Sequence, residues 1–216
     1  MTLFVTGTDT GVGKTHTITQ LLRLLRSLGL TAAGFKPICC GDRGDAHELL
    51  GASTAGLTID EVNPIWLKTP LAPLPAAELE RRKIDIHEIL RGLDKLRQRV
   101  DLVLVEGVGG WLVPIRSDYL VRDLAVDMQL PVLIVALNRL GCLNHTLLTV
   151  QSVLDSGLSC GGVVLNDTGS EDDIAKTTNA DVLRRLLSVP VLPLLRDDTG
   201  QLPLDWARLL GVQKPV

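Results

Sequence analysis

A glycine-rich segment near the amino terminus constrains the fold of this chain more than any other feature. The segment Gly7-Thr8-Asp9-Thr10-Gly11-Val12-Gly13-Lys14-Thr15 separates a short apolar run, Leu3–Thr6, from an amphipathic stretch, Thr15–Ser27. A buried strand, a glycine loop and a helix in this order wrap backbone N–H groups around phosphate oxygens at a helix N-terminus. In such a loop Lys14 neutralises the β- and γ-phosphates and the Thr15 hydroxyl ligates Mg²⁺. The alternative is a glycine-rich turn that only opens a helix.

The spacing of the loop departs from the usual pattern at one position. That pattern places a glycine six residues before the lysine, whereas Thr8 stands there and Gly7 comes one residue too early. The lysine, the hydroxyl residue and the following helix are all present. The sequence therefore predicts that ATP is bound by the loop and the first helical residues, namely Gly11, Val12, Gly13, Lys14, Thr15 and His16.

Short apolar runs alternate with longer amphipathic stretches along the rest of the chain. Strands are expected at Leu3–Thr6, Ala32–Phe35, Leu102–Val105, Val132–Leu137, Gly162–Leu165 and Val191–Leu194. Helices are expected at about 15–27, 45–50, 86–98, 120–128, 143–155, 172–187 and 203–210. The region from 41 to about 82 otherwise reads as irregular, with a proline-rich loop containing Pro64, Pro70, Pro73 and Pro75. This order predicts a single α/β domain over residues 1–216, a doubly wound, mainly parallel sheet flanked by helices, similar to P-loop NTPases.

Composition excludes several classes of partner. The chain has 22 basic and 25 acidic residues, a formal net charge of −3, which argues against nucleic acid and anionic membranes. Its 3 Trp, 1 Tyr and 2 Phe leave few side chains for stacking on bases. The four cysteines have no zinc spacing, and the amino terminus does not resemble a signal peptide. We therefore expect reduced thiols and a cytoplasmic location.

Charged residues follow two of the expected strands, and ligands of open α/β sheets bind at the carboxyl ends of strands. Glu106 comes directly after Leu102–Val105 and is followed by the run Gly107–Gly110, whose glycines allow close approach of the backbone to anions. It is a candidate metal ligand or a solvated carboxylate. Lys36 follows Ala32–Phe35, where it either points into the same crevice as Lys14 or is only a solvent-exposed cation. Asp45 opens a short helix, where it is either a ligand or only an N-cap.

Asn166 and Asp167 follow the strand Gly162–Leu165. They either read the edge of a nucleobase or form an Asx turn. The histidines share no metal-binding spacing, and no Ser/His/Asp or Cys/His arrangement is recognisable. The candidate chemistry therefore rests on phosphate binding and on the charged groups at the strand ends.

Five motifs together resemble the dethiobiotin synthetase family, in the order in which that family has them. They are Gly-Thr-Asp-Thr-Gly-Val-Gly-Lys-Thr (7–15), Gly-Phe-Lys-Pro (34–37), Glu-Gly-Val-Gly-Gly-Trp (106–111), Gly-Cys-Leu-Asn-His (141–145) and Asn-Asp (166–167). The resemblance spans residues 3 to about 195, and the early glycine with Thr8 belongs to the family's own pattern. It implies a P-loop homodimer that closes the ureido ring of dethiobiotin from 7,8-diaminononanoate, CO₂ (or bicarbonate) and ATP, with Mg²⁺ as cofactor.

The resemblance also implies a role for individual residues. Lys36 and Lys14 would be catalytic, and Thr15, Asp45 and Glu106 would hold the metal. ATP would further contact Gly107, Val108, Gly109, Asn166, Asp167, Arg196, Asp197 and Asp198. The substrate would contact Thr10, Lys36, Cys40, Gly109, Gly141, Cys142, Leu143 and Asn144. Three positions depart from the family: Cys40 stands where Ser is common, Gly11 is acidic in some relatives, and the segment 196–198 lacks a common proline.

The segment Gly141–Asn144 begins an expected helix, so its N–H groups should be free to bind an anion such as the substrate carboxylate. In the family this helix end comes from the partner subunit, so a homodimer completes each site. The alternative is that Gly141 and Asn144 only cap the helix.

Two classes of competing function remain. One is another P-loop ATPase, of the partitioning type or resembling a cobyrinate synthase; Asp9 stands where the partitioning type has a second lysine, and 216 residues leave no room for a glutaminase domain. The other is a nucleotide-binding module without turnover. Such a module needs Lys14 but has no use for a second cation at Lys36.

Overall fold

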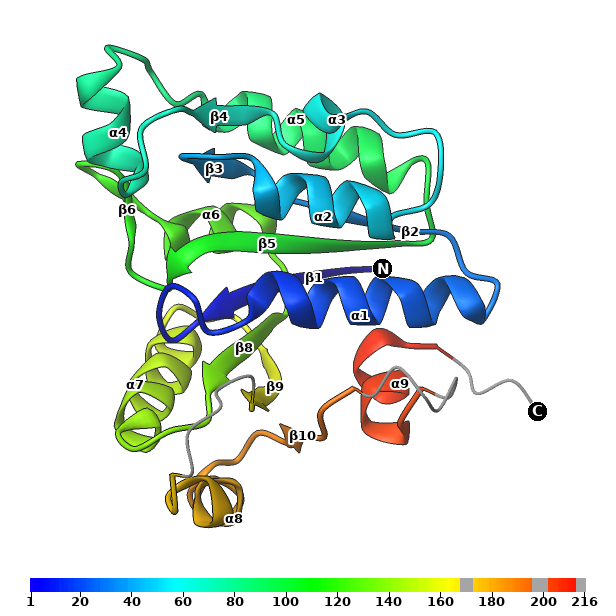
Figure 1. Cartoon of the computed structure of the whole chain (residues 1–216), viewed down its shortest axis with the longest axis vertical. Helices are drawn as coiled ribbons and strands as arrows, with labels where there is room; N and C mark the ends of the chain where they lie inside the picture. Colours follow the sequence, from blue (N-terminus) through cyan, green and yellow to red (C-terminus); the bar gives the residue numbers. More distant parts are fainter. Residues whose placement is uncertain (168–172, 196–201, 213–216) are drawn as a thin grey trace.

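The computed structural model describes residues 1–167, 173–195 and 202–212. Its main sheet contains β1 (Thr2–Gly7), β2 (Ala32–Phe35), β5 (Leu102–Gly110), β8 (Val132–Leu137), β9 (Cys160–Asn166) and β10 (Val191–Leu192). These strands are parallel and lie in the order β10-β9-β8-β1-β5-β2 (Figure 1). The prediction of a doubly wound, mainly parallel sheet is confirmed.

Helices cover both faces of this sheet. They are α1 (Lys14–Ser27), α2 (Gly44–Ala52), α3 (Ile59–Val62), α4 (Pro73–Leu79), α5 (Ile86–Arg97), α6 (Val121–Met128), α7 (Cys142–Asp155), α8 (Lys176–Leu186) and α9 (Leu204–Leu210). Helices α1, α2 and α9 pack with one set of strand side chains, and α5, α6, α7 and α8 pack with the other. Within the described residues no helix is long and apolar enough to cross a membrane.

The side chains of the central strand β1 point alternately to the two faces of the sheet, which explains the two packed layers. Leu3 and Val5 of β1 point into the layer of α1, whereas Phe4 points into the opposite layer, and all three are fully buried. Phe4 meets Trp111 edge to face, with ring centroids 6.4 Å apart. Burying both faces of a parallel sheet requires the continuous apolar runs that the sequence has at each strand. The two cores therefore hold the carboxyl ends of β1, β2 and β5 at one edge.

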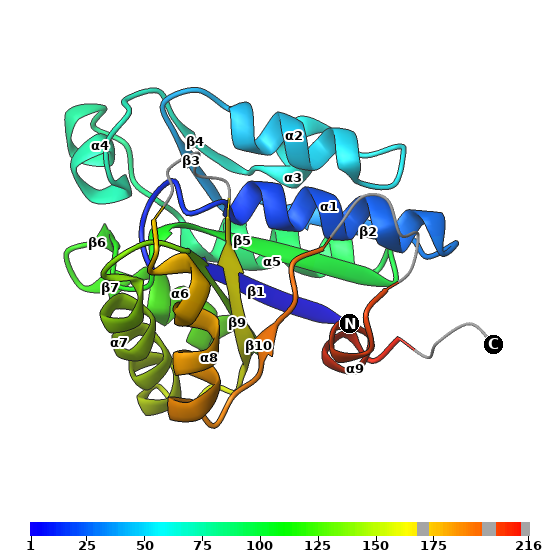
Figure 2. The same cartoon turned by 60° about the horizontal axis from the view of Figure 1, so that its bottom comes forward.

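The middle of the chain differs from the expected irregular region. β3 (Ile38–Cys40) pairs with β4 (Ile65–Leu67), and the short helix α3 lies between α2 and β4. The prediction of a proline-rich loop was wrong in part, because Pro73 is the first residue of α4. Proline is tolerated there because the N–H group that it lacks would have no partner within the helix. β6 (Pro114–Arg116) and β7 (Tyr119–Leu120) form a further hairpin that was not predicted. Figure 2 shows this hairpin beside α4 at one end of the molecule.

Candidate active site

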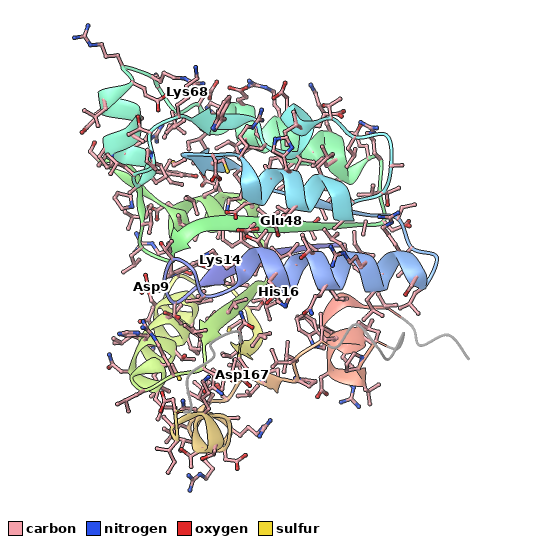
Figure 3. All side chains as sticks on the ribbon, viewed as in Figure 1. Asp9, Lys14, His16, Glu48, Lys68 and Asp167 are labelled. Carbon is pink, nitrogen blue, oxygen red and sulfur yellow. The ribbon has the colours of Figure 1, made fainter. Side chains whose placement is uncertain are left out.

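The glycine loop joins the carboxyl end of β1 to the first turn of α1. Gly13 is the N-cap of α1 with φ of +94°, and a Cβ there would lie 1.7 Å from Nδ2 of Asn166. Only glycine fits this position, because both the backbone angle and the neighbouring amide exclude a side chain. Lys14 folds back over the loop, so its Nζ donates to the carbonyl oxygen of Asp9 at 3.1 Å. Figure 3 labels Asp9, Lys14 and His16 around this turn.

Four side chains from four different segments meet beside this loop. Nζ of Lys36 lies 2.7 Å from Oδ2 of Asp45 and 2.5 Å from Oε1 of Glu106. The Thr15 hydroxyl donates to the same Glu106 oxygen at 2.9 Å. Lys36 and Glu106 are 3% and 1% exposed. The sequence placed these residues at strand and helix ends, and the structure brings them together as one cluster, which we call the charged cluster. Lys36 and Glu106 form its buried part, whereas Thr15 and Asp45 are partly exposed.

The ends of the surrounding elements position the charged cluster. Glu106 lies within β5, which continues to Gly110, so the expectation that the strand ends at Val105 was wrong. Glu106 pairs with Val5 of β1, which lies two residues before the glycine segment. Asp45 lies in the first turn of α2, whose N-cap is Arg43, so the N-cap alternative for Asp45 was also wrong.

The two lysines have opposite pKa shifts. Burial lowers the pKa of Lys14 to about 8, an effect that nearby Lys36 reinforces and Glu106 opposes. Burial also disfavours the charged form of Lys36, but Glu106 and Asp45 outweigh it and raise the pKa of Lys36 above its ordinary value. Burial would raise the pKa of Asp45, yet Lys36 holds it below its ordinary value. Lys36 is therefore a fixed cation, whereas Lys14 titrates near neutrality.

The cluster has oxygen atoms of the kind that hard divalent cations prefer. Oε2 of Glu106 is buried and has no hydrogen-bond partner among the described residues, although an unpaired carboxylate oxygen is costly to bury. Thr15 and Asp45 supply further oxygens within the charged cluster. No group of three His, Cys, Asp or Glu side chains with metal-binding geometry occurs in the described part of the chain. A cation here would therefore need ligands from the nucleotide or from water as well.

A cavity of about 730 Å³ opens onto the charged cluster. Its lining includes Thr10, Cys40, Gly109 and His16, whose contacts with substrate and ATP stay predictions. Burial raises the pKa of the Cys40 thiol to about 11, so it is neutral and a weak hydrogen-bond donor. Glu48, which Figure 3 labels on α2, also lines it.

The predicted adenine contacts lie on the other side of the loop. Nδ2 of Asn166 donates to the carbonyl oxygen of Val12 at 3.0 Å, and Asp167 accepts from Nδ2 of Asn138 at 2.8 Å. Asn166 thus supports the glycine loop directly, and its contact with adenine stays a prediction. Arg196, Asp197 and Asp198 lie outside the described residues.

The segment Gly141–Asn144 opens α7, as expected, with Gly141 as a left-handed N-cap at φ +89°. The expectation that all its N–H groups are free was wrong for Cys142, which donates to the carbonyl oxygen of Arg139 at 3.1 Å. Asn144 lines a different cavity, between α7 and α8, rather than the one at the charged cluster. Within one chain this helix end therefore does not line the cavity at the glycine loop.

Sequence reasoning missed an apolar part of the cavity. Pro70, Leu71 and Ala72, which precede α4, and Val113, which precedes β6, line it. No sequence motif marks them. The signal that could have located the first three is Pro73, since a proline at the first turn fixes the start of a helix and exposes the residues before it.

Comparisons with known proteins agree with this geometry. A family model described as an AAA domain matches residues 1–199. An ATP-dependent dethiobiotin synthetase from Akkermansia muciniphila is 46% identical over 201 residues, covering 93% of this chain and 94% of the relative. One from Bacillus licheniformis is 39% identical over 202 residues, covering 90% and 86%.

Among solved structures, the septum site-determining protein MinD from Pyrococcus horikoshii, complexed with Mg-ADP, superposes with a TM-score of 0.54. It is 18% identical, covering 92% of this chain and 82% of that one, so the likeness concerns the fold alone. Together with the family model it confirms the P-loop NTPase-like fold. Since both relatives are well above 30% identical over nearly the whole length of each protein, this chain belongs to the family of ATP-dependent dethiobiotin synthetases.

Proposed function

We propose that this chain closes the ureido ring of dethiobiotin from 7,8-diaminononanoate, CO₂ and ATP, releasing ADP and phosphate. One substrate amine adds to CO₂ and loses a proton, which gives a carbamate. A carbamate oxygen then attacks the γ-phosphorus, and the bond from that phosphorus to the ADP oxygen breaks. The second amine attacks the carbamoyl carbon, loses a proton, and expels phosphate as the ring closes.

The central difficulty of this reaction is that a carbamate and a triphosphate are both anions. Cations between them lower the barrier, and fixed cations in a buried site are the most effective. Lys36 suits this role because it is 3% exposed and its pKa is raised, so it remains an ammonium. Lys14 suits the β- and γ-phosphates, since it lies over the glycine loop. Lys36 must exchange a carboxylate contact for the carbamate when substrate binds.

We propose that Thr15, Asp45 and Glu106 hold Mg²⁺ together with the nucleotide. The buried, unpartnered Oε2 of Glu106 supports this, because a cation would satisfy it. Bound Mg²⁺ would neutralise phosphate charge. The further ATP contacts proposed are the glycine loop, His16, Gly107–Gly109, Asn166 and Asp167, together with the segment 196–198.

The single observation that carries the proposal is the second buried ammonium, Lys36, in the cavity of the phosphate loop. A nucleotide-binding module or a simple ATPase does not require it. The test measures phosphate release from Mg-ATP with the diamine and bicarbonate supplied separately and together. We expect release only when both are present, with dethiobiotin formed in equal amount. Rapid hydrolysis without the diamine would contradict the proposal.

We also propose a homodimer whose active sites are shared. The substrate carries two amines at one end and a carboxylate at the other, so its carboxylate must bind away from Lys36. The start of α7 offers N–H groups for this carboxylate, yet Asn144 does not line the cavity of its own chain. A second subunit would bring that helix end to the site.

Mixing two inactive variants tests the shared site. Lys36→Ala removes the fixed cation, and Asn144→Asp places a negative charge where the carboxylate would bind. After random exchange of subunits, half of the dimers are mixed and each has one intact site, so activity should return to about one quarter of the wild-type value. Each variant exchanged with itself is the control. Absence of recovery despite demonstrated exchange would contradict sharing.

A further inference from the structure

The cavity at the glycine loop has two chemically different walls. One is the charged cluster with Lys14. The other, which we call the apolar wall, consists of Pro70, Leu71, Ala72 and Val113. Both Figures 1 and 2 show α4 beside β6, so the two parts of the apolar wall come from neighbouring elements. Phosphate chemistry uses the first wall only.

The apolar wall is held in place before any ligand binds. Pro70 packs on Gly41, where a Cβ would lie only 3.1 Å from the Pro70 Cβ. Gly41 is fixed in turn, because its carbonyl oxygen accepts from Nε1 of Trp66 at 2.8 Å and its N–H donates to Leu67 at 2.9 Å. Thr69 N–H donates to Oε1 of Glu80 at 2.7 Å. The backbone before α4 is therefore already ordered, so ligand binding should cost it little further conformational entropy.

Pro70, Leu71 and Ala72 are all exposed, and Leu71 has the largest side chain of the three. It is 46% exposed although it lines the cavity. An exposed aliphatic side chain on a backbone that is already held in place is stabilised when a ligand covers it, since apolar surface then leaves water. The ligand that fits is aliphatic, and it must also reach the charged cluster.

We propose that Leu71 is a specificity-determining residue that contacts the aliphatic chain of the diamine substrate. The proposal rests on the function proposed above, which places the amines at the charged cluster and leaves the methylene chain to be covered. The apolar wall borders the same cavity, so the chain passes from charged to apolar surroundings without leaving it. Leu71 binds the chain equally in the ground state and the transition state, because no charge develops there.

The test compares Leu71→Ala, Leu71→Met and Leu79→Ala with the wild type. Leu79 is a matched control, an exposed leucine at the other end of α4, 68% exposed and outside the cavity. In Leu71→Ala we expect KM for 7,8-diaminononanoate to rise about tenfold with kcat and the KM for ATP unchanged, because only uniform binding is lost. Leu71→Met keeps an apolar side chain and should hold KM near the wild-type value. Leu79→Ala should leave kcat and both KM values at their wild-type levels.

A second substrate separates a chain contact from a general disturbance. 2,3-Diaminobutane keeps the vicinal amines and lacks the chain, so Leu71→Ala should affect it no more than Leu79→Ala does, whether it is followed as a substrate or as a competitor. An unchanged KM for the nine-carbon substrate, or an equal loss with both diamines, would overturn the inference while wild-type turnover upholds the function. No ureido product from the wild type would overturn the proposed function, and the inference with it.

Discussion

Lys36→Ala is expected to lower kcat by about 10²–10³-fold while the affinity for ADP changes little. The reason is the position of the ammonium: Lys36 contacts Asp45 and Glu106 beside the phosphate loop, whereas Lys14 lies over the loop itself. Negative charge accumulates as the carbamate attacks the γ-phosphate, and Lys36 stabilises this charge mainly in the transition state. Steady-state turnover and calorimetric ADP titration separate the two effects.

Removing Lys36 also leaves two carboxylates without their cation, one of them the buried Glu106. Lys36→Met fills the same volume without charge and should be as inactive as the alanine variant. Lys68, an exposed lysine beside Trp66, is the matched control, and Lys68→Ala should keep wild-type turnover. Full activity in a folded Lys36 variant would show that the ammonium has no part in the reaction.

Lys14→Ala is expected to weaken ADP binding by about 10²-fold or more and to lower turnover as well. A lysine that meets phosphate contributes in the ground state and in the transition state, and losing a charge-assisted contact in a buried site costs about 2–5 kcal/mol. This pattern differs from that of Lys36, since both affinity and rate fall. Calorimetric titration with ADP at constant ionic strength measures it.

The lowered pKa of Lys14, about 8 in the free protein, adds a pH dependence to this prediction. Below pH 8 the ammonium is charged and attracts phosphate, and above it the neutral amine does not, so wild-type ADP affinity should fall as pH rises through about 8. Lys14→Ala should lose that dependence. A wild-type affinity that is flat between pH 7 and 9, or an unchanged dependence in the variant, would contradict the assignment.

The parts of the fold that the sequence predicted best are buried strands with sharp boundaries. β8 spans Val132–Leu137 as expected, because an apolar run lies between Pro131 and Asn138 and is buried on both faces. The segment from 38 to 79 was predicted poorly. Its strands β3 and β4 have three residues each and pair across 24 intervening residues, so no local periodicity reveals them.

The same distinction holds for the site. Lys14, Lys36 and Glu106 could be located because Lys14 ends the glycine loop after β1, Lys36 follows β2, and Glu106 lies toward the carboxyl end of β5. The carboxyl ends of neighbouring parallel strands share one edge. The ion pair between Lys36 and Glu106 could not be predicted, since the two residues are 70 positions apart in the sequence. The apolar wall was missed for another reason: Leu71 and Val113 belong to loops and carry no chemistry that a motif would mark.

The most direct test of the proposed reaction follows labelled atoms from CO₂ into both products. The purified chain would receive Mg-ATP, 7,8-diaminononanoate and C¹⁸O₂ containing ¹³C, in an assay shorter than the exchange of CO₂ oxygens with water. A carbamate oxygen that attacks the γ-phosphorus stays with the phosphate when the second amine expels it. Mass spectrometry should therefore find ¹³C in the ureido carbon of dethiobiotin and one ¹⁸O atom in each released phosphate. Phosphate without ¹⁸O, or phosphate release without labelled dethiobiotin, would contradict the account.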